Sequence, residues 1–311
     1  MNLKNQINKS IEEHNNFIDM VIKNKYCHEG ESCWEDIVDR LGKVLDLTYD
    51  EKECILNKRF IPGGSILSGA GKDNISMSNC YGIPIKSSNN EPCDSIDAIF
   101  DTQKNIANVS KARGGCGFIL TALRPKNEKV NNAAKTSTGA VSFLPSFSEV
   151  GKVVGQGHRR SALISLLDIR HPDTLDFIWC KSKPEKVFQK DIFTEHYPDI
   201  SSINISLIIP DEFYNAVEND EDWIFKFPDI ECDKEKYNSY WHGDYEDWEK
   251  NNGELKEYGR INARELLKEI SESAWYSGDP GQYLITNAQE NCYSTYIDDK
   301  IKPRLTNPCG R

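Results

Sequence analysis

The alternation of short apolar runs with longer helical patterns constrains the fold of this chain more than any other feature. From Arg59 onward, runs typical of strands occur at 66–67, 80–85, 117–120, 163–169 and 203–209. The clearest helical patterns cover residues 94–110, 141–154 and 263–277. Strands and helices that alternate in this way predict an α/β fold built on a mostly parallel sheet.

The region before Arg59 has a different character. Leu3, Ile7 and Ile11 lie four residues apart, which is the spacing of one helical face. Further helices are predicted at 34–45 and 49–57. We therefore expect a helical N-terminal region over residues 1–58, followed by an α/β unit over residues 59–311.

Negative charge is concentrated in one part of the chain. The net charge is −11, and 16 acidic but only 6 basic residues lie between Asp211 and Arg260. This balance predicts an acidic insertion at about 211–260, and the weak periodicity of residues 234–259 predicts limited order there. Nucleic-acid binding needs basic surface, so we expect no nucleic-acid partner.

Ten cysteines occur without any C-x-x-C pair, which excludes a zinc ribbon, and we predict no metal site. Cys27, His28 and Cys33 lie close in sequence, but ordinary thiols near a helix end explain them more simply. No apolar run of about 18 residues is present, so no membrane partner is expected. The first residues lack the apolar stretch of a secretory signal, which predicts reduced thiols in the cytoplasm.

Four segments dense in Gly, Ser, Asn and Arg fall at predicted strand–helix junctions: 62–71, 78–81, 113–118 and 156–162. Backbone amides in such loops can cradle phosphate oxygens. The adjacent Arg159 and Arg160 suit a bidentate grip on phosphate or stacking on a base. The first segment lacks the ending of a P-loop, and each segment alone also fits an ordinary glycine-rich turn.

The last five residues read Asn307-Pro308-Cys309-Gly310-Arg311. A cysteine between a rigid and a permissive backbone position is typical of a presented side chain. Alone, however, the pentapeptide fits an ordinary turn at a chain end better than an active site. Its meaning depends on the segments that precede it.

Taken together and in order, these segments resemble the catalytic subunit of a ribonucleotide reductase, most closely the class II, adenosylcobalamin-dependent type. The resemblance covers about residues 55–311 outside the acidic insertion. It rests on the following motifs: Arg59-Phe60, Pro62-Gly63-Gly64, Ile66-Leu67, Gly69-Ala70-Gly71, Asn79-Cys80-Tyr81, Asp94-Ser95-Ile96, Gly114-Gly115, Gly117-Phe118, Leu123-Arg124-Pro125, Gly139, Ser142-Phe143, Arg159-Arg160, Ala162, His171-Pro172-Asp173, Asn204, Ser206 and Asn307-Pro308-Cys309-Gly310. It implies the first half of a ten-stranded α/β barrel that reduces ribonucleotides by a cysteine thiyl radical.

The resemblance also implies catalytic roles. Cys309 matches the radical cysteine, and Asn307 matches the asparagine that hydrogen-bonds the ribonucleotide substrate. Cys80 matches one of two redox-active cysteines, which a thioredoxin-like reductant reduces after each turnover. The second redox cysteine of the family lies beyond the radical cysteine, so Cys292 is not expected to take this role.

Binding sites follow in the same way. Ser65, Asn79 and Gly115 match substrate-binding positions. Asp94 and Ser95 match the start of an effector site for a deoxynucleotide or ATP at a homodimer interface, where Arg124 and Lys135 would meet the phosphates. The expected specificity loop contains Gln156, Arg159 and Arg160, and it couples the effector to the substrate base.

One position departs from the family pattern. Arg311 stands where the family has a glutamate that acts as general base, and a guanidinium cannot be deprotonated in a protein. We therefore hypothesise the N-terminal part of a split or truncated reductase, inactive without a C-terminal reductase fragment.

Several alternatives remain. The chain is an effector-binding fragment without catalysis, a fragment of a diiron-dependent class I large subunit, or a glycyl-radical enzyme on the same barrel. Asp94 and the Arg159-Arg160 pair argue against the acyl-transfer glycyl-radical type. The shortness of residues 1–58 favours cobalamin over diiron, because class I chains usually begin with a larger nucleotide-binding domain. The choice between di- and triphosphate substrates stays open.

Overall fold

The computed structural model describes residues 3–89, 91–130, 133–154, 161–298 and 301–309. It divides into two compact units, Met1–Asn79 and Cys80–Arg311. Each unit has its own apolar core.

The first unit is helical. It contains α1 (Leu3–Lys25), α2 (Trp34–Val44), α3 (Tyr49–Leu56) and α4 (Gly64–Gly69). The helices predicted at 34–45 and 49–57 are therefore present, but the strand predicted at 66–67 is wrong, because these residues lie in α4. Leu67 and Ala70 pack into the same core as Ile37 and Leu41 of α2, so this unit extends beyond residue 58.

The second unit is built on a five-stranded parallel sheet with the order β1-β2-β3-β4-β7. The strands are β1 (Cys80–Gly82), β2 (Gly115–Ile119), β3 (Leu163–Asp168), β4 (Ile203–Ile209) and β7 (Gly281–Leu284). β3 and β4 are almost continuously apolar, as expected for parallel strands buried on both faces. The predicted α/β fold with a parallel sheet is confirmed.

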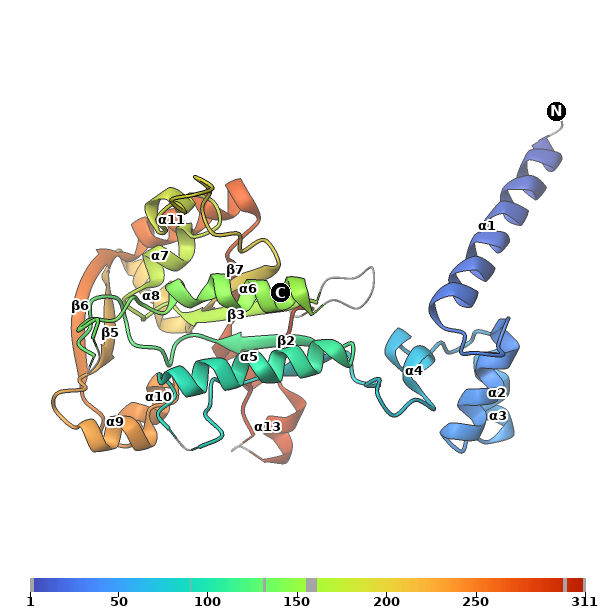
Figure 1. Ribbon diagram of the computed structural model, residues 1–311, viewed down its shortest axis with the longest axis horizontal. Helices are drawn as coiled ribbons and strands as arrows, with labels where there is room; N and C mark the ends of the chain where they lie inside the picture. Colours follow the sequence, from blue (N-terminus) through green and yellow to red (C-terminus); the bar gives the residue numbers. More distant parts are fainter. Residues whose placement is uncertain (1–2, 90, 131–132, 155–160, 299–300, 310–311) are drawn as a thin grey trace. The chain divides into compact units, whose positions relative to one another are not determined.

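Helices cover one face of the sheet, which we call the outer face. They are α5 (Ile96–Lys111), α6 (Leu144–Val153), α7 (Thr174–Trp179), α8 (Asp211–Asn219) and α11 (Ala263–Ser277), and Figure 1 shows α5 and α6 running alongside the strands. Phe118 of β2 and Phe147 of α6 stack with ring centroids 4.4 Å apart. Alternate residues of β3 and β4, including Leu167 and Leu207, point into this core.

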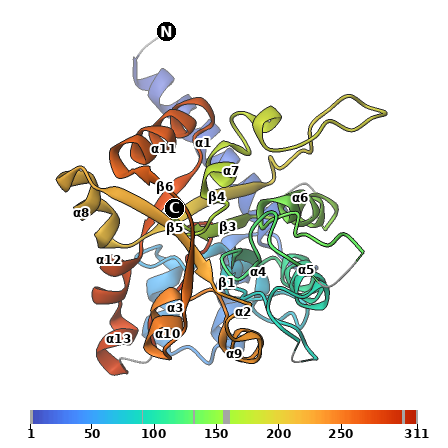
Figure 2. The ribbon, with the colours of Figure 1, turned by 90° about the vertical axis from the view of Figure 1, so that its left-hand side faces the viewer.

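The acidic stretch is ordered, contrary to the sequence prediction. β5 (Asp222–Pro228) and β6 (Leu255–Asn262) form an antiparallel ribbon, with α9 (Lys234–Tyr240) and α10 (Tyr245–Lys250) at one end of it (Figure 2). We call residues 222–262 the acidic module. Its core consists of aromatic side chains: Phe227, Tyr237, Trp241, Tyr245 and Trp248. These contacts join residues far apart in the segment, which explains why local periodicity missed them.

Further short elements complete the unit. They are the 3₁₀ turns η1 (Val141–Phe143) and η2 (Pro184–Lys186), and the helices α12 (Ile285–Glu290) and α13 (Tyr293–Ile297). Among the described residues, no helix combines the length and apolar character needed to cross a membrane.

Residues 303–309, which we call the C-terminal segment, have no regular secondary structure and cross the inner face of the sheet. Leu305 packs there with Ile164, Leu166 and Ile208. The crossing requires glycine on the strands. A Cβ at Gly82 would lie 2.6 Å from Leu305 Cδ1.

Gly117, the register partner of Gly82, is tighter still, because a Cβ there would overlap the Thr306 carbonyl oxygen. The missing side chains therefore form the groove in which the C-terminal segment lies.

We predict that Gly117→Ala displaces the C-terminal segment while the sheet remains folded, because the added methyl group occupies the place of the Thr306 carbonyl. Amide hydrogen exchange over residues 303–309 should become faster. Gly259→Ala in β6 is the matched control, since a Cβ there meets no atom within 4 Å. Unchanged exchange in Gly117→Ala would show that the groove does not hold the segment.

Candidate active site

Two cysteines from opposite ends of the second unit meet at the inner face. The Sγ atoms of Cys80 and Cys309 lie 3.6 Å apart, although 229 positions separate them in sequence. Cys80 begins β1 and is half-buried, whereas Cys309 is exposed near the end of the C-terminal segment. The fold therefore brings together the two thiols that the sequence analysis singled out.

A tight turn presents Cys309. The backbone N–H of Cys309 donates a hydrogen bond of 2.9 Å to Oδ1 of Asn307, two residues earlier. An asparagine side chain that accepts from the backbone two residues on mimics a backbone turn. Asn307 thus shapes the turn that carries the thiol, in addition to any contact with a ligand.

The surroundings of Cys80 keep its thiol protonated. Burial, and then the adjacent Cys309 thiol, raise the pKa of Cys80 to about 11. Cys116 lies on the neighbouring strand in register with Tyr81, so it faces away from Cys80 into the outer core. Burial raises the pKa of Cys116 to about 12, which makes it an inert packing thiol.

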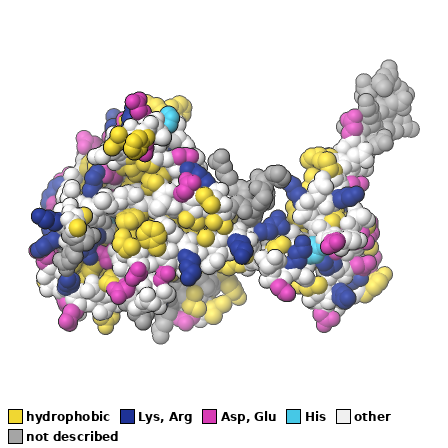
Figure 3. Space-filling view, in the orientation of Figure 1, with side chains coloured by type: hydrophobic (Ala, Val, Ile, Leu, Met, Phe, Trp, Pro, Cys, Tyr) yellow, Lys and Arg dark blue, Asp and Glu magenta, His cyan; other side chains and the backbone are white. Residues whose placement is uncertain are grey.

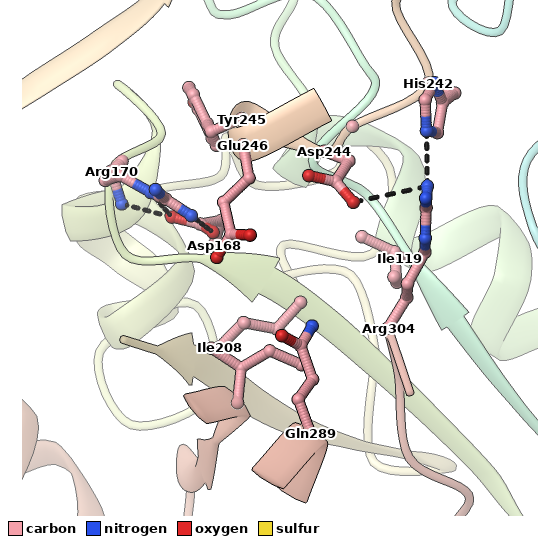
Figure 4. A pocket seen from close by; sticks show the side chains of 12 residues that line it. Ile119, Asp168, Arg170, Ile208, His242, Asp244, Tyr245, Glu246, Gln289 and Arg304 are labelled. Carbon is pink, nitrogen blue, oxygen red and sulfur yellow. Dashed lines mark hydrogen bonds and ion pairs between the residues drawn. The ribbon is translucent and has the colours of Figure 1, made fainter. Parts of the chain in front are cut away.

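A small pocket of about 60 Å³ lies at the start of the C-terminal segment, and its lining residues hold that segment in place (Figure 4). Arg304 forms an ion pair of 3.2 Å with Asp244 of the acidic module and also contacts the ring of His242. Gln289 of α12 donates a hydrogen bond of 3.0 Å to the carbonyl oxygen of Pro303. The segment is therefore held at its start by the acidic module and α12.

Two charged side chains that line this pocket are paired with each other. Arg170 binds Asp168 at the end of β3 through two hydrogen bonds of 2.8 and 2.7 Å. Its guanidinium carbon lies 4.5 Å from the ring centroid of Tyr245. A buried pair with this geometry fixes the local fold, because removing one member would leave an uncompensated charge.

A larger cavity of about 660 Å³ lies where α5 begins. Asp94, Ser95 and Arg124 line it, and Asp94 and Arg124 form an ion pair of 2.7 Å. Tyr237 of the acidic module donates a hydrogen bond of 2.8 Å to Asp94. Ser95 accepts from the backbone N–H of Ala98 and so caps α5.

Comparison with known proteins identifies the family of this architecture. Residues 80–310 match the barrel domain of ribonucleotide reductase. The chain belongs to this family. The match covers all five strands of the sheet and the C-terminal segment with Cys309, whereas the first unit lies outside it.

Similar sequences include two vitamin B12-dependent ribonucleoside-diphosphate reductases. The Thermoplasma acidophilum protein is 30% identical over 83% of this chain and 28% of its own length. The Mycobacterium tuberculosis protein is 27% identical over 88% of this chain and 35% of its own length. The chain thus spans about a third of the length of these relatives.

The fold is also similar to a solved structure, the class Id ribonucleotide reductase alpha subunit of Actinobacillus ureae. The TM-score is 0.62 at 18% identity, and the similarity covers 94% of this chain and 44% of that subunit. At this identity the similarity concerns the fold alone.

The other predicted site residues fall in different parts of the reductase chain. In the first unit, the Ser65 hydroxyl donates to the Asn79 side-chain oxygen. In the second unit, Gly115 is the register partner of Cys80. Lys135 is exposed and lies between Ala134 and Thr136, which line the larger cavity. Gln156, Arg159, Arg160 and Arg311 lie outside the described residues.

The His-Pro-Asp motif of the reductase acquires a structural role. The ring of His171 is fully buried, and its Nε2–H donates 2.9 Å to the Leu123 carbonyl while Nδ1 accepts from the Asp173 N–H. Burial lowers the pKa of this histidine, which suits a neutral ring. The Asp173 carboxylate accepts from the backbone N–H groups of Lys126 and Ala140. These contacts fix the loop that lines the larger cavity.

Sequence reasoning missed Tyr237, Asp244 and Arg304. Tyr237 and Asp244 belong to the acidic module, whose contacts with the cavity and the C-terminal segment depend on its tertiary fold. The aromatic richness of residues 234–259 was the only local signal for an ordered module.

We predict that Cys80 is a slow thiol toward alkylating agents. The thiolate is the reactive form, and a pKa of about 11 lowers the thiolate fraction near pH 8 by about 100-fold relative to a free thiol of pKa 9.0, which slows the reaction. Site-resolved mass spectrometry after iodoacetamide treatment measures this rate, which should rise with pH up to about 11. Cys292 is the internal reference, because the Ser294 hydroxyl lowers its pKa. Equal rates at the two cysteines would contradict the assignment.

Proposed function

We propose that this chain contributes part of the active site of a ribonucleotide reductase, which converts ribonucleotides to 2′-deoxyribonucleotides by a thiyl radical on Cys309. The observation that carries the proposal is the meeting of Cys80 and Cys309 on a glycine-lined sheet face. The chain spans 28% and 35% of the lengths of the two relatives, and a C-terminal reductase fragment is proposed to supply the remaining barrel.

In this proposal Cys309 takes the 3′-hydrogen of the ribose and later returns it. Loss of the 2′-hydroxyl as water consumes two electrons and two protons, which two thiols provide as they become a disulfide. Cys80 is one of these thiols, and the second belongs to the C-terminal fragment. Asn307, whose amide is oriented by the Cys309 N–H, hydrogen-bonds the substrate hydroxyls. A thioredoxin-like protein regenerates the thiols by exchange.

The radical source and the substrate are proposed from the relatives and from the exposure of Cys309. Adenosylcobalamin, when bound, supplies the radical. Cys309 is exposed, as required of a thiol that yields its hydrogen atom to an external group. The two relatives are named as vitamin B12-dependent diphosphate reductases, which supports a ribonucleoside diphosphate as substrate. Ser65, Asn79 and Gly115 are proposed to contact this substrate, and the cytoplasm is the proposed compartment.

The larger cavity is the proposed effector site for a deoxynucleoside triphosphate or ATP. Asp94 and Ser95 line it, and Arg124 and Lys135 are proposed to meet the phosphates. On the adjacent helix α5, Ile96 and Phe100 are 58% and 54% exposed. Hydrophobic side chains gather on the face that carries α5 and α6 (Figure 3), which supports a homodimer through this face. The specificity loop with Gln156, Arg159 and Arg160 is proposed to transmit effector identity.

Reconstitution tests the catalytic proposal. The chain, mixed with a C-terminal reductase fragment, adenosylcobalamin, dithiothreitol and a ribonucleoside diphosphate, should form deoxynucleotide. Cys309→Ser should abolish product, because the hydroxyl O–H bond is too strong for reversible hydrogen transfer. Cys232→Ser, at an exposed thiol of the acidic module, is the control and should retain activity. Product formation by Cys309→Ser, or none by the wild-type mixture, would refute the proposal.

Binding of deoxynucleoside triphosphates tests the effector proposal independently of turnover. Asp94→Ala should weaken binding by about tenfold or more, equivalent to about 1.4 kcal/mol, because it removes a cavity-lining group and releases its partner Arg124. Asp97→Ala, three residues further on in the first turn of α5, is the matched control, since Asp97 is exposed and does not line the cavity. Calorimetric titration that shows equal affinity for both variants would contradict the assignment.

A further inference from the structure

The sulfur atoms of Cys80 and Cys309 are already in contact. The Sγ–Sγ separation is 3.6 Å, whereas a disulfide bond is about 2.05 Å long. A small movement of one side chain on a turn can close this difference. Cys309 lies in such a turn, outside any helix or strand. We propose that Cys80 and Cys309 form a reversible disulfide with each other when the chain meets a low-molecular-weight disulfide such as oxidised glutathione.

This bond differs from the pairing that the family resemblance implies, in which Cys80 joins a cysteine beyond Cys309. The alternative partner on the neighbouring strand is Cys116, which is completely buried in the core on the outer face of the sheet. Cys292 contacts the Ser294 hydroxyl at 3.0 Å. The geometry therefore selects Cys309 as the partner of Cys80.

Exposure sets the order of the chemical steps. Cys309, the exposed member, attacks one sulfur of oxidised glutathione as a thiolate, and one glutathione leaves as a thiolate. Cys80 then loses its proton and attacks the Cys309 sulfur, and the second glutathione leaves. Two protein thiols are oxidised by two electrons, and one external disulfide is reduced to two thiols.

The attack of Cys80 on the Cys309–glutathione disulfide is opposed by the pKa of Cys80 but favoured by geometry. The raised pKa of Cys80 leaves little thiolate at neutral pH, so the rate of this step should rise with pH toward about 11. Contact between the two sulfur atoms compensates, because an intramolecular attack proceeds at a high effective concentration. Closure should therefore outpace the attack of a second glutathione on the mixed disulfide.

A consequence for catalysis follows, and it rests on the proposed function. A Cys309 sulfur held in a disulfide has no S–H bond to exchange with a ribose hydrogen. Oxidation would therefore hold the site in an inactive form, and the thiol reductant that serves turnover would also restore it.

The test uses the full chain with oxidised glutathione, followed by peptide mapping under non-reducing conditions. Wild type should yield a cross-linked pair of peptides that contain Cys80 and Cys309, and dithiothreitol should reverse it. Cys80→Ser should instead accumulate glutathione on Cys309. Cys292→Ser is the matched control and should cross-link as wild type does. Gly117→Ala should close at least about tenfold more slowly, because the displaced segment loses its high effective concentration.

Two results would overturn the proposal: a wild-type chain that keeps glutathione on Cys309 with Cys80 still reduced, or one that joins Cys80 to another cysteine. The assay contains no nucleotide and no cobalamin. A cross-link in a chain that never supports deoxynucleotide formation would leave this inference intact and refute the proposed function. The reverse pair of results would refute only the disulfide.

Discussion

The site depends on one contact, the passage of residues 303–309 across the glycine-lined inner face of a parallel sheet. Without Cβ atoms at Gly82 and Gly117, the segment lies against the strands, and Leu305 reaches the apolar residues beneath it. The position of Cys309 follows from this contact, because its own turn fixes only the two preceding residues. A side chain on either strand would lift the segment and separate the thiols. Glycine in a strand loses more conformational freedom on folding than other residues, and the packing of the C-terminal segment against Gly82 and Gly117 offsets this cost.

The acidic module contacts both the C-terminal segment that carries Cys309 and the larger cavity that Asp94 lines, and the interactions that hold it differ in strength. The ion pair between Arg304 and Asp244 is partly exposed, and such pairs stabilise a fold by about 1 kcal/mol at most. The five buried aromatic side chains of the module's own core remove far more apolar surface from water. Aromatic packing therefore holds the module together, while its polar contacts set the alignment of the C-terminal segment and of Asp94. One ordered module thus contacts Asp94 of the larger cavity through Tyr237 and the start of the C-terminal segment through Asp244.

Sequence patterns predicted the elements whose signal is local. The strand Ile203–Ile209 and the helix Ala263–Ser277 have the predicted bounds, because the first is a mostly apolar run and the second a long periodic one, each with polar residues or turn signals at its ends. Two apolar residues at 66–67 could not distinguish a strand from a helix, and α4 formed there. The order of the acidic module rests on contacts between distant aromatic residues. In the site, Cys80 and Cys309 came from the family resemblance, whereas the anchors Arg304 and Asp244 carry no local signal.

Burial gives the two thiols different chemistry, although they touch. With a pKa of about 11, Cys80 is ionised in only about 1 of 10,000 molecules at pH 7, so it resists external electrophiles. A protonated thiol can still contribute the one electron and one proton that each of the two thiols provides when the substrate is reduced. Cys309 is exposed and meets external groups first. Cys80 therefore stores reducing equivalents while Cys309 meets external molecules, because the inner face of the sheet partly buries the first sulfur and leaves the second exposed.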